Sequence, residues 1–394
     1  MPHQEKTKMA DTLSLYIHIP FCVRKCRYCD FVSGPWLDQK ELYLQSVCEE
    51  IAQTDFSCRQ VDTVFIGGGT PTLLKCQEME RILNAVHARF SVSAHAEISM
   101  EANPGTVSEE ELKHYHEMGI NRLSLGIQSF SARMLRTLGR IHSGQEAVKA
   151  VSWAREAGFD NLNMDLMYGL PEQSIKEFES TLATALSMHP EHLSLYSLIL
   201  EEGTPFYQEA QAGTLILPGE EEVLAMERMA GQFLQQNGYE RYEVSNFAQK
   251  GMECRHNLVY WECLPYLGFG PGAHSDAGGR FYNEESIDKW VQQVRGKAVI
   301  KEGNGSWQER AFERMMMGLR LVRGVDCCRF YKDFGMLPEE RWPNSIRKFL
   351  KAGLLVQDAG RLRCSERGMD VLNSILTYLL EEQDEADCPN NTFQ

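Results

Sequence analysis

The sequence has no long apolar segment, no excess of basic residues and no second cysteine pair of the kind that structural zinc sites use. No apolar run approaches the ~20 residues that a membrane-spanning helix requires. The first residues, Met-Pro-His-Gln-Glu-Lys, lack the apolar core of a signal peptide. The net charge of −15 argues against a nucleic-acid partner, because phosphate binding depends on a basic surface. These absences predict a cytoplasmic protein.

Cysteine, in contrast, is abundant, with 12 residues in a chain of 394. A disulfide scaffold would be shorter and would carry an export signal, so we expect reduced thiols. Cys22, Cys26 and Cys29 follow one another at C-x3-C-x2-C spacing. A [4Fe–4S] cluster ordinarily takes four cysteines, and three would leave one iron open to an outside ligand. The alternative is zinc, which usually needs four ligands and paired C-x2-C units. No second pair lies nearby, and the other nine cysteines show no spacing for a second cluster.

Apolar runs and helical patterns alternate through the first half of the chain. The runs are rich in Leu, Ile and Val, as strands buried on both faces must be. Such alternation predicts parallel β/α units with right-handed crossovers. Six units suggest a partial (β/α)6 barrel, with a full eight-unit barrel or a doubly wound sheet as alternatives. The predicted strands are 13–19, 61–66, 96–100, 122–127, 161–167 and 192–200, and the predicted helices are 37–53, 77–90, 108–118, 144–157 and 174–188.

Polar residues and glycines occur at or near the ends of these predicted strands, where parallel β/α folds place their sites. Gly68 and Gly69 would let a ligand approach the backbone closely, although a tight strand-to-helix turn is the commoner explanation of such glycines. Thr70 would cap the next helix. Arg140 has the geometry to pair with a carboxylate, and Glu101 could accept from an amino group or a ribose hydroxyl.

The remaining candidates have equally plain alternatives. Gln128 and Asp165 could hold ribose hydroxyls, or could be ordinary surface or capping residues. Tyr16 and Tyr28 flank the cysteines, where their rings could shield a cluster from water or stack on adenine. Core packing accounts for Tyr16 equally well.

The cysteine loop resembles that of the radical SAM superfamily, in which the open iron binds S-adenosylmethionine (SAM). Tyr-Ile-His-Ile-Pro-Phe-Cys, Cys-Arg-Tyr-Cys-Asp-Phe, Gly-Gly-Gly-Thr-Pro-Thr and Glu-Gly-Thr-Pro-Phe narrow the resemblance to the oxygen-independent coproporphyrinogen III oxidase group. The resemblance implies the [4Fe–4S] cluster on the three cysteines and a SAM pocket lined by the strand-end residues above.

That group has an oxidase branch and a heme chaperone branch, HemW. The oxidase branch carries a further cysteine where this chain has Phe31, and a longer N-terminal extension than the fifteen residues before Tyr16. Both departures favour the chaperone branch. Arg255–Trp261 resembles the H-N-x-x-Y-W element of that branch, which implies that His256 binds heme, with the thiolate of Cys254 as an alternative ligand. A packed core histidine is the plain alternative.

The alternation stops near residue 310. We predict an N-terminal tail over 1–12, a radical SAM partial barrel over 13–245 and a connecting segment over 246–310. A smaller winged-helix-like domain over 311–380 and a disordered acidic tail over 381–394 complete the division.

The sequence therefore predicts a heme chaperone with a [4Fe–4S] cluster, SAM and heme as cofactors. Its predicted partner is a heme-accepting apoprotein such as a membrane respiratory enzyme, with peripheral membrane association and a homodimer left open. The alternatives are a coproporphyrinogen III oxidase, a radical enzyme acting on another substrate, or a scaffold whose cluster only senses oxygen.

Overall fold

The computed structural model describes residues 12–56, 59–303 and 305–387 of the chain. These residues form two compact units. The first takes in the described residues of Met1–Glu240, Ser245–His256 and Pro265–Glu302, and the second those of Arg241–Val244, Asn257–Leu264 and Gly303–Gln394. The predicted N-terminal tail, up to residue 11, lies outside the described residues.

Six parallel strands form the centre of the first unit, in the same order in space as in sequence. They are β1 (Thr12–Ile19), β2 (Gln60–Gly68), β3 (Ser91–Ala102), β4 (Arg122–Gln128), β5 (Leu162–Tyr168) and β6 (His192–Ser197). The sheet order is linear, with two ends, so the predicted partial barrel is confirmed and a closed eight-stranded barrel is excluded for the described residues. The main difference is at β3, which begins five residues earlier and ends two residues later than predicted, whereas β6 ends three residues earlier.

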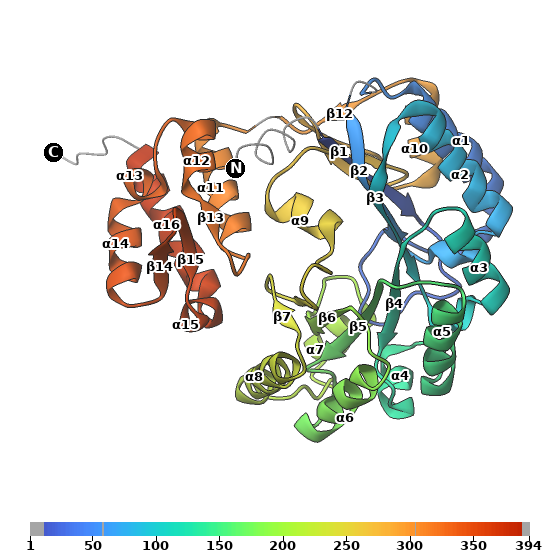
Figure 1. Ribbon diagram of the computed structural model, residues 1–394, viewed down its shortest axis with the longest axis horizontal. Helices are drawn as coiled ribbons and strands as arrows, with labels where there is room; N and C mark the ends of the chain where they lie inside the picture. The colour runs from blue at the N-terminus through green and yellow to red at the C-terminus, as the bar shows by residue number, and fades with distance from the viewer. Residues whose placement is uncertain (1–11, 57–58, 304, 388–394) are drawn as a thin grey trace. The chain divides into compact units, whose positions relative to one another are not determined.

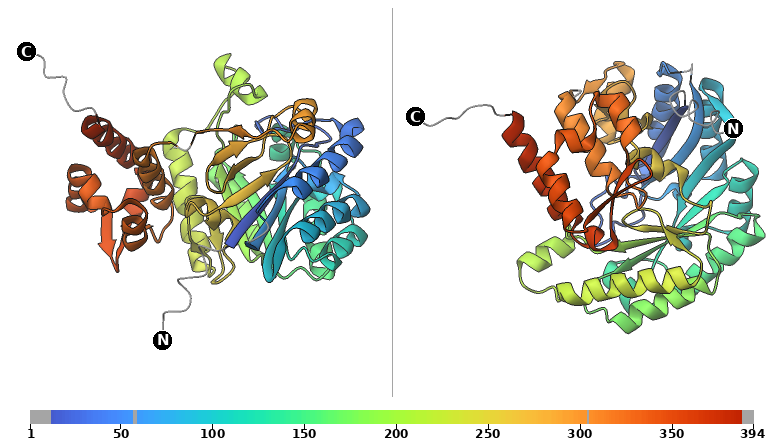
Figure 2. Two further views of the ribbon diagram at one scale, coloured as in Figure 1. Left: turned by 90° about the horizontal axis from the view of Figure 1, so that it is seen from above. Right: turned by 60° about the vertical axis from the view of Figure 1, so that its left-hand side comes forward.

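Helices cover the outer face of this sheet, as Figure 1 and the two views of Figure 2 show. They are α1 (Lys40–Gln53), α2 (Cys76–Arg89), α3 (Glu109–Glu117), α4 (Ala132–Leu138), α5 (Gly144–Glu156), α6 (Ile175–Leu186) and α8 (Glu220–Gln236). The short helix α7 (Pro205–Gln211) projects away from this layer (Figure 2). The two faces of β1 differ because alternate side chains point in opposite directions. Leu13, Leu15 and Ile17 belong to the apolar core, whereas Ser14 and His18 are buried polar residues of the alternate set. The strands thus build an apolar core on one face and a polar interior on the other.

Ser-to-Glu capping boxes begin three of these helices. Ser108, Ser143 and Ser174 each accept a hydrogen bond from the backbone of a glutamate three residues later, at α3, α5 and α6. Each glutamate carboxylate accepts in return from the serine backbone. Two orphan N–H groups are satisfied in this way at each helix start, which explains why the observed helices begin within a residue of the predicted starts.

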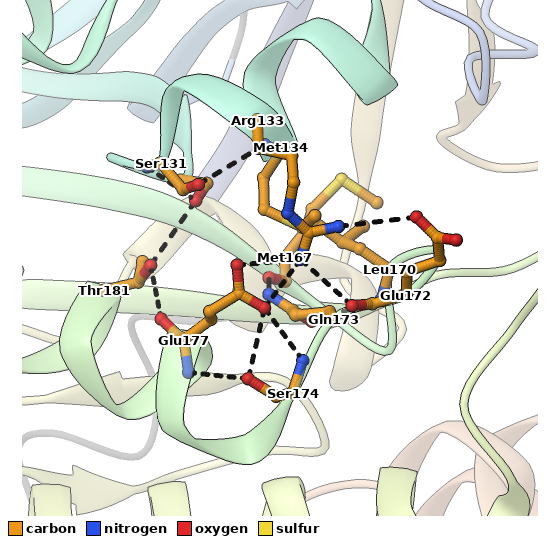
Figure 3. A network of polar contacts seen from close by, with 11 residues as sticks. Ser131, Arg133, Met134, Met167, Leu170, Glu172, Gln173, Ser174, Glu177 and Thr181 are labelled. Atoms are coloured by element: carbon orange, nitrogen blue, oxygen red, sulfur yellow. Dashed lines mark hydrogen bonds and ion pairs between the residues drawn. The ribbon is translucent and has the colours of Figure 1, made fainter.

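The turn after β5 is held by a polar network (Figure 3). The Gln173 amide accepts from Leu170 N at 3.1 Å and donates to Met167 O at 3.4 Å. Arg133 of α4 donates to both carboxylate oxygens of Glu177 in α6, at 2.7 Å, and to the carbonyl of Glu172. These contacts join α4 to the start of α6 and fix the loop that leaves the strand carrying Asp165.

The segment predicted as a connection instead extends the sheet at both edges. On one edge this segment forms β9 (Tyr266–Phe269), β10 (His274–Asp276), β11 (Arg280–Tyr282) and β12 (Ile300–Lys301), and on the other β8 (Asn246–Ala248). The outermost strand on that second edge is β7 (Glu240–Arg241), which comes from the end of the predicted barrel. The segment also forms α10 (Ile287–Arg295). The half-buried Glu50 of α1 accepts from Gly270 N, Asn283 Nδ2 and Trp290 Nε1, which ties this extension to the barrel. Loss of hydration raises the pKa of Glu50 to about 7.

The second unit has its own apolar core around Trp342 and Phe330. Its helices are α11 (Trp307–Gly318), α12 (Cys327–Phe334), α13 (Pro338–Arg341), α14 (Pro343–Lys351), α15 (Glu366–Asp370) and α16 (Leu372–Asp387). An antiparallel sheet joins β13 (Val325–Asp326), β15 (Arg361–Cys364) and β14 (Leu355–Asp358). Helices followed by a β-hairpin agree with the predicted winged-helix-like pattern, and two helices, α15 and α16, follow the hairpin (Figure 1).

The prediction of disorder from residue 381 is wrong for residues 381–387, because α16 continues to Asp387. The Glu382 carboxylate explains part of this extension. It accepts from the backbone N–H groups of Asn344 and Ser345, at 2.9 and 2.8 Å, and so caps the start of α14. Residues 388–394 lie outside the described part of the chain. No helix within the described residues is both long and apolar enough to span a membrane.

Candidate functional site

The three cysteines lie on the loop that leaves β1. The loop is closed at its base by hydrogen bonds from Cys22 N to Gly34 O and from Gly34 N to Pro20 O, both 2.9 Å. Arg27 fixes its middle. The backbone N–H of Arg27 donates to Leu138 O, and its guanidinium donates to Thr137 O, both at 3.1 Å. The loop therefore rests on the C-terminal end of α4.

Helix α7 holds Arg27 from the other side. The guanidinium pairs with Glu209 and lies 4.8 Å from the ring centre of Phe206, whose backbone N–H donates to Arg27 O. Arg27 thus links α4, which ends at Leu138, to α7, which begins 67 positions later at Pro205. The sequence analysis did not identify this residue, although it lies between two of the cysteines.

All three cysteines are free thiols and partly exposed. Cys22 Sγ lies 3.6 Å from Thr70 Oγ1, and Cys26 Sγ accepts from Arg140 Nη1 at 3.5 Å. Burial raises the pKa of the Cys29 thiol to about 11, so binding a metal there must displace a proton. Within the described residues, no group of three or more His, Cys, Asp or Glu side chains is arranged around a single metal ion. Cysteines of a [4Fe–4S] cluster bind separate irons, so they need no shared centre.

Arg140 lies at the centre of a polar network at the carboxyl ends of β2, β3 and β4. Its guanidinium donates to Gly126 O at 2.5 Å and to the side-chain oxygen of Asn103. The Asn103 amide donates in turn to Thr70 Oγ1 at 2.9 Å. Thr70 is the N-cap residue of the following 3-10 helix (Pro71–Leu73), as predicted, but its side chain makes no capping hydrogen bond. Its hydroxyl instead links Asn103 to Cys22, a connection that the sequence analysis missed.

The glycines at the end of β2 are crowded by the protein itself. A Cβ on Gly68 would lie 2.5 Å from His18 Cε1, and the φ of Gly68 is +108°, a value that favours glycine. A Cβ on Gly69 would lie 2.5 Å from Phe21 O. The backbone N–H of Gly68 donates to Glu101 Oε2 at 3.0 Å. The tight-turn explanation of these glycines therefore has direct support, and ligand approach stays a prediction.

Two carboxylates face the polar interior near this edge. Loss of hydration, with a smaller contribution from Asp165, raises the pKa of Glu101 to about 8. Burial also raises the pKa of Asp165, although Asn163 and Ser124 donate to its two oxygens at 2.8 and 3.2 Å. Both side chains remain partly exposed. An interior with two carboxylates of raised pKa favours a ligand that brings positive charge or N–H and O–H donors.

Gln128 has an unusual backbone at the end of β4. Its φ is +65°, beside an irregularity in the register between β4 and β5. Its side chain is 8% exposed, and Oε1 has no hydrogen-bond partner among the described residues. Strained backbone of this kind costs about 1–3 kcal/mol and is concentrated at ligand sites.

The two tyrosines predicted near the cluster occupy different surroundings. Tyr16 donates to, or accepts from, His18 Nδ1 at 2.9 Å, and His18 Nε2 lies 2.7 Å from Val32 O in the cysteine loop. Tyr28 packs with the apolar group around Met134 and Phe206. Burial raises the pKa of both hydroxyls, so they stay protonated. Tyr16 thus reaches the cysteine loop through His18, whereas Tyr28, inside the loop, packs against apolar side chains. Shielding of a cluster by either ring stays a prediction.

His256 lies in the barrel interior, away from the cysteine loop along β2. Its side chain is 1% exposed, and its Nδ1 lies 2.8 Å from Thr63 Oγ1. Burial lowers the pKa of its imidazole to about 3, with Arg122 adding to the shift. Cys254 is buried as well and lies 3.5 Å from Glu97 Oε1. The structure thus separates this histidine from Cys22, Cys26 and Cys29 and shows what holds it.

The residues present fit a cluster and SAM. Three unpaired thiols share one loop, and the orphaned Gln128 Oε1 is a buried acceptor that a ligand hydroxyl would satisfy. Glu101 of β3 and Asp165 of β5 supply two carboxylates, and Arg140, bonded to Gly126 O of β4 between them, supplies one cation. This donor set matches a zwitterionic ligand with ribose hydroxyls.

Comparison with known proteins agrees with this geometry. Residues 16–185 match the radical SAM superfamily and residues 306–371 the HemN C-terminal domain. The chain is 36% identical to the heme chaperone HemW of Bacillus subtilis over 379 residues, covering 94% of this chain and 99% of that one. The Escherichia coli HemW is also 36% identical, with 94% and 98% covered.

Among solved structures, coproporphyrinogen III oxidase (HemN) from Escherichia coli, a radical SAM enzyme, has a TM-score of 0.81 and 25% identity. The match covers 93% of this chain and 89% of that one. The relatives named HemW thus match over nearly the whole length at higher identity than the oxidase does. The chain therefore belongs to the HemW family of heme chaperones, within the radical SAM superfamily.

Proposed function

We propose that this protein binds heme and delivers it to apoproteins such as respiratory enzymes. The observation that carries the proposal is the 36% identity to two heme chaperones over 94% of the chain, against 25% to the oxidase. Phe31, which is 58% exposed, adds support because the oxidase branch has a cysteine at this position. The shared fold does not separate the two functions, since the oxidase has nearly the same architecture.

The radical SAM family implies a [4Fe–4S] cluster and SAM. In this chain Cys22, Cys26 and Cys29 would hold the cluster. When both groups are bound, the cluster supplies an electron, and SAM supplies the bond that this electron breaks. The protein's own part is to bind and orient. Arg140 would receive the carboxylate of SAM and Glu101 its amino group or a ribose hydroxyl, while Gln128 and Asp165 would hold ribose hydroxyls.

Heme would bind at the element that begins with Cys254 and includes α9 (Arg255–Trp261). Tyr260 and Trp261 are partly exposed and supply flat apolar surface suited to a porphyrin. His256 and Cys254 are the two iron ligands that the sequence suggests. Because both are buried, the proposal rests on the element as a whole rather than on one ligand.

A second candidate function is oxidative decarboxylation of coproporphyrinogen III. The residues at the first SAM site favour it, because the cysteine loop, the glycine turn and the Arg140 network are all present. Phe31 opposes it. A radical reaction on another substrate is compatible with the same residues.

The deciding experiment uses the anaerobically reconstituted protein. One part is incubated with coproporphyrinogen III, SAM and a strong reductant, and the porphyrins are separated by chromatography. The other part is titrated with heme and then mixed with a heme-depleted respiratory enzyme. We expect heme binding and recovery of the acceptor's activity, and no protoporphyrinogen. Many turnovers to protoporphyrinogen would replace the chaperone proposal with the oxidase.

The same assay addresses partner and location. Recovery of activity by a membrane respiratory enzyme would support such an enzyme as the heme acceptor. A cytoplasmic location, with peripheral attachment to the membrane where the acceptor resides, is part of the proposal, because reduced thiols are kept in that compartment. The homodimer stays a prediction. Measuring the size of the protein in solution, with and without its cluster, would test it.

A further inference from the structure

His256, at the start of the proposed heme-binding element, has its ring inside the barrel. With 1% of the side chain exposed, neither ring nitrogen of His256 can meet a heme iron unless the side chain leaves its site. A porphyrin is far larger than the space beside a buried imidazole, and protein interiors are close-packed. What holds His256 there is therefore the relevant question.

Two barrel strands supply the contacts. Thr63 of β2 forms the 2.8 Å hydrogen bond with Nδ1, and Phe65 stacks on the imidazole with ring centres 5.2 Å apart and an interplanar angle of 26°. From β3, the Glu97 carboxylate accepts from the backbone N–H groups of Arg255 and His256, at 3.0 and 3.1 Å. Glu97 is itself 6% exposed. A carboxylate at these N–H groups satisfies the start of α9 and complements its dipole.

The contacts continue from His256 toward the cysteine loop. Phe65 also stacks on Tyr16, at 6.3 Å and 26°, and Tyr16 bonds to His18, whose Nε2 reaches Val32 O. The start of α9 and the cysteine loop thus belong to one packed column inside the barrel. Nothing in this column requires iron at His256.

We propose that His256 is a positioning residue, which acts through Nδ1 and Thr63 to anchor the first turn of α9, and that heme iron is bound by another group. The inference rests on the proposed function, because it concerns how the heme-binding element is held. It assigns Thr63, Phe65 and Glu97 as the partners that hold it.

The test compares four single variants of the full chain carrying its cluster: His256→Ala, His256→Asn, Thr63→Val and Trp261→Ala. Asparagine places its side-chain oxygen or nitrogen near the position of Nδ1, so it keeps the hydrogen bond to Thr63 whether the threonine hydroxyl donates or accepts. It has no atom at the position of Nε2. Valine keeps the shape of threonine and removes the hydroxyl. Heme affinity and the visible spectrum of bound heme are measured, with iron and sulfide content and circular dichroism as folding controls.

We expect Thr63→Val and His256→Ala to weaken heme binding about tenfold, the usual cost of leaving one buried polar partner unsatisfied. His256→Asn should recover most of that loss, and the heme spectrum should be the same in all three. A Thr63→Ser variant, which keeps the hydroxyl, should behave like the parent and serves if Thr63→Val does not fold.

Other results overturn the inference in distinguishable ways. If Thr63→Val binds heme normally while His256→Ala and His256→Asn both change its spectrum, His256 is an iron ligand and the positioning role is wrong. If the His256 and Thr63 variants all bind heme like the parent, His256 has neither role. If Trp261→Ala is then also unaffected, the proposed heme-binding element itself is wrong.

Discussion

The guanidinium of Arg140 lies 3.5 Å from the sulfur of Cys26 and also bonds to Gly126 O and Asn103. One side chain therefore contacts both a predicted cluster ligand and the predicted SAM pocket. The pKa of Arg140 is raised by Tyr28 and Cys26, which outweigh the effect of its burial. The arginine remains charged beside the loop.

Arg140→Lys should weaken SAM binding about tenfold to hundredfold, because lysine keeps the charge but cannot donate in parallel to a carboxylate and the network. Anaerobic calorimetry of the cluster-loaded protein measures the change. Arg136→Lys, a basic residue in the last turn of α4, is the matched control. Unchanged affinity in Arg140→Lys would mean that SAM carboxylate recognition lies elsewhere.

Cys26→Ala should abolish the visible absorbance of the cluster after anaerobic reconstitution, since two cysteines cannot hold three irons. Iron and sulfide analysis gives the content directly. Cys48→Ala, which removes a partly exposed thiol of α1, should retain full content. A Cys26→Ala protein with full iron and sulfide would refute the cluster assignment.

Arg27→Ala should make the cluster more sensitive to oxygen, because the loop loses its contacts to Thr137 O, Phe206 and Glu209. The ion pair is about one-third exposed and contributes at most about 1 kcal/mol. Most of the effect should therefore come from loop mobility. The rate of bleaching in air is the readout. Arg24→Ala, which removes one exposed bond to Gly139 O, is the control. Equal rates in both variants would contradict the role of Arg27.

Glu101 should make the cluster-free protein less stable as pH rises. Its pKa is about 8 in the folded protein against an ordinary value of 4.5. Between these values the folded state keeps a proton that the unfolded chain releases, so the free energy of unfolding falls with pH and levels off above pH 8. Glu101→Gln should remove this slope. Urea unfolding of the parent protein and of Glu101→Gln, each at pH 6 and pH 8.5, measures this slope. Asp165, whose pKa is also raised, is present in both proteins. Parallel curves would show that Glu101 ionises normally.

The parallel strands, most of the helices and the spacing of the three cysteines could be predicted from local sequence patterns. Apolar strands and Ser-to-Glu helix starts are local signals, so β2, α3 and α5 lie within a few residues of their predicted bounds. Parallel connections then force strand ends to one edge, which is why Thr70, Glu101 and Arg140 could be grouped without knowing their contacts.

Which side chains contact one another depends on the folded chain and could not be predicted from these patterns. Asn103 joins Arg140 to Thr70, and Thr63 holds His256 across 193 positions of sequence. The strands β9–β12 pair through backbone groups of short segments that have little apolar pattern. Helix α16 extends because Glu382 finds the N–H groups of α14. Contacts of this kind depend on the path of the chain through space, whereas a local pattern reports only which face of an element is buried.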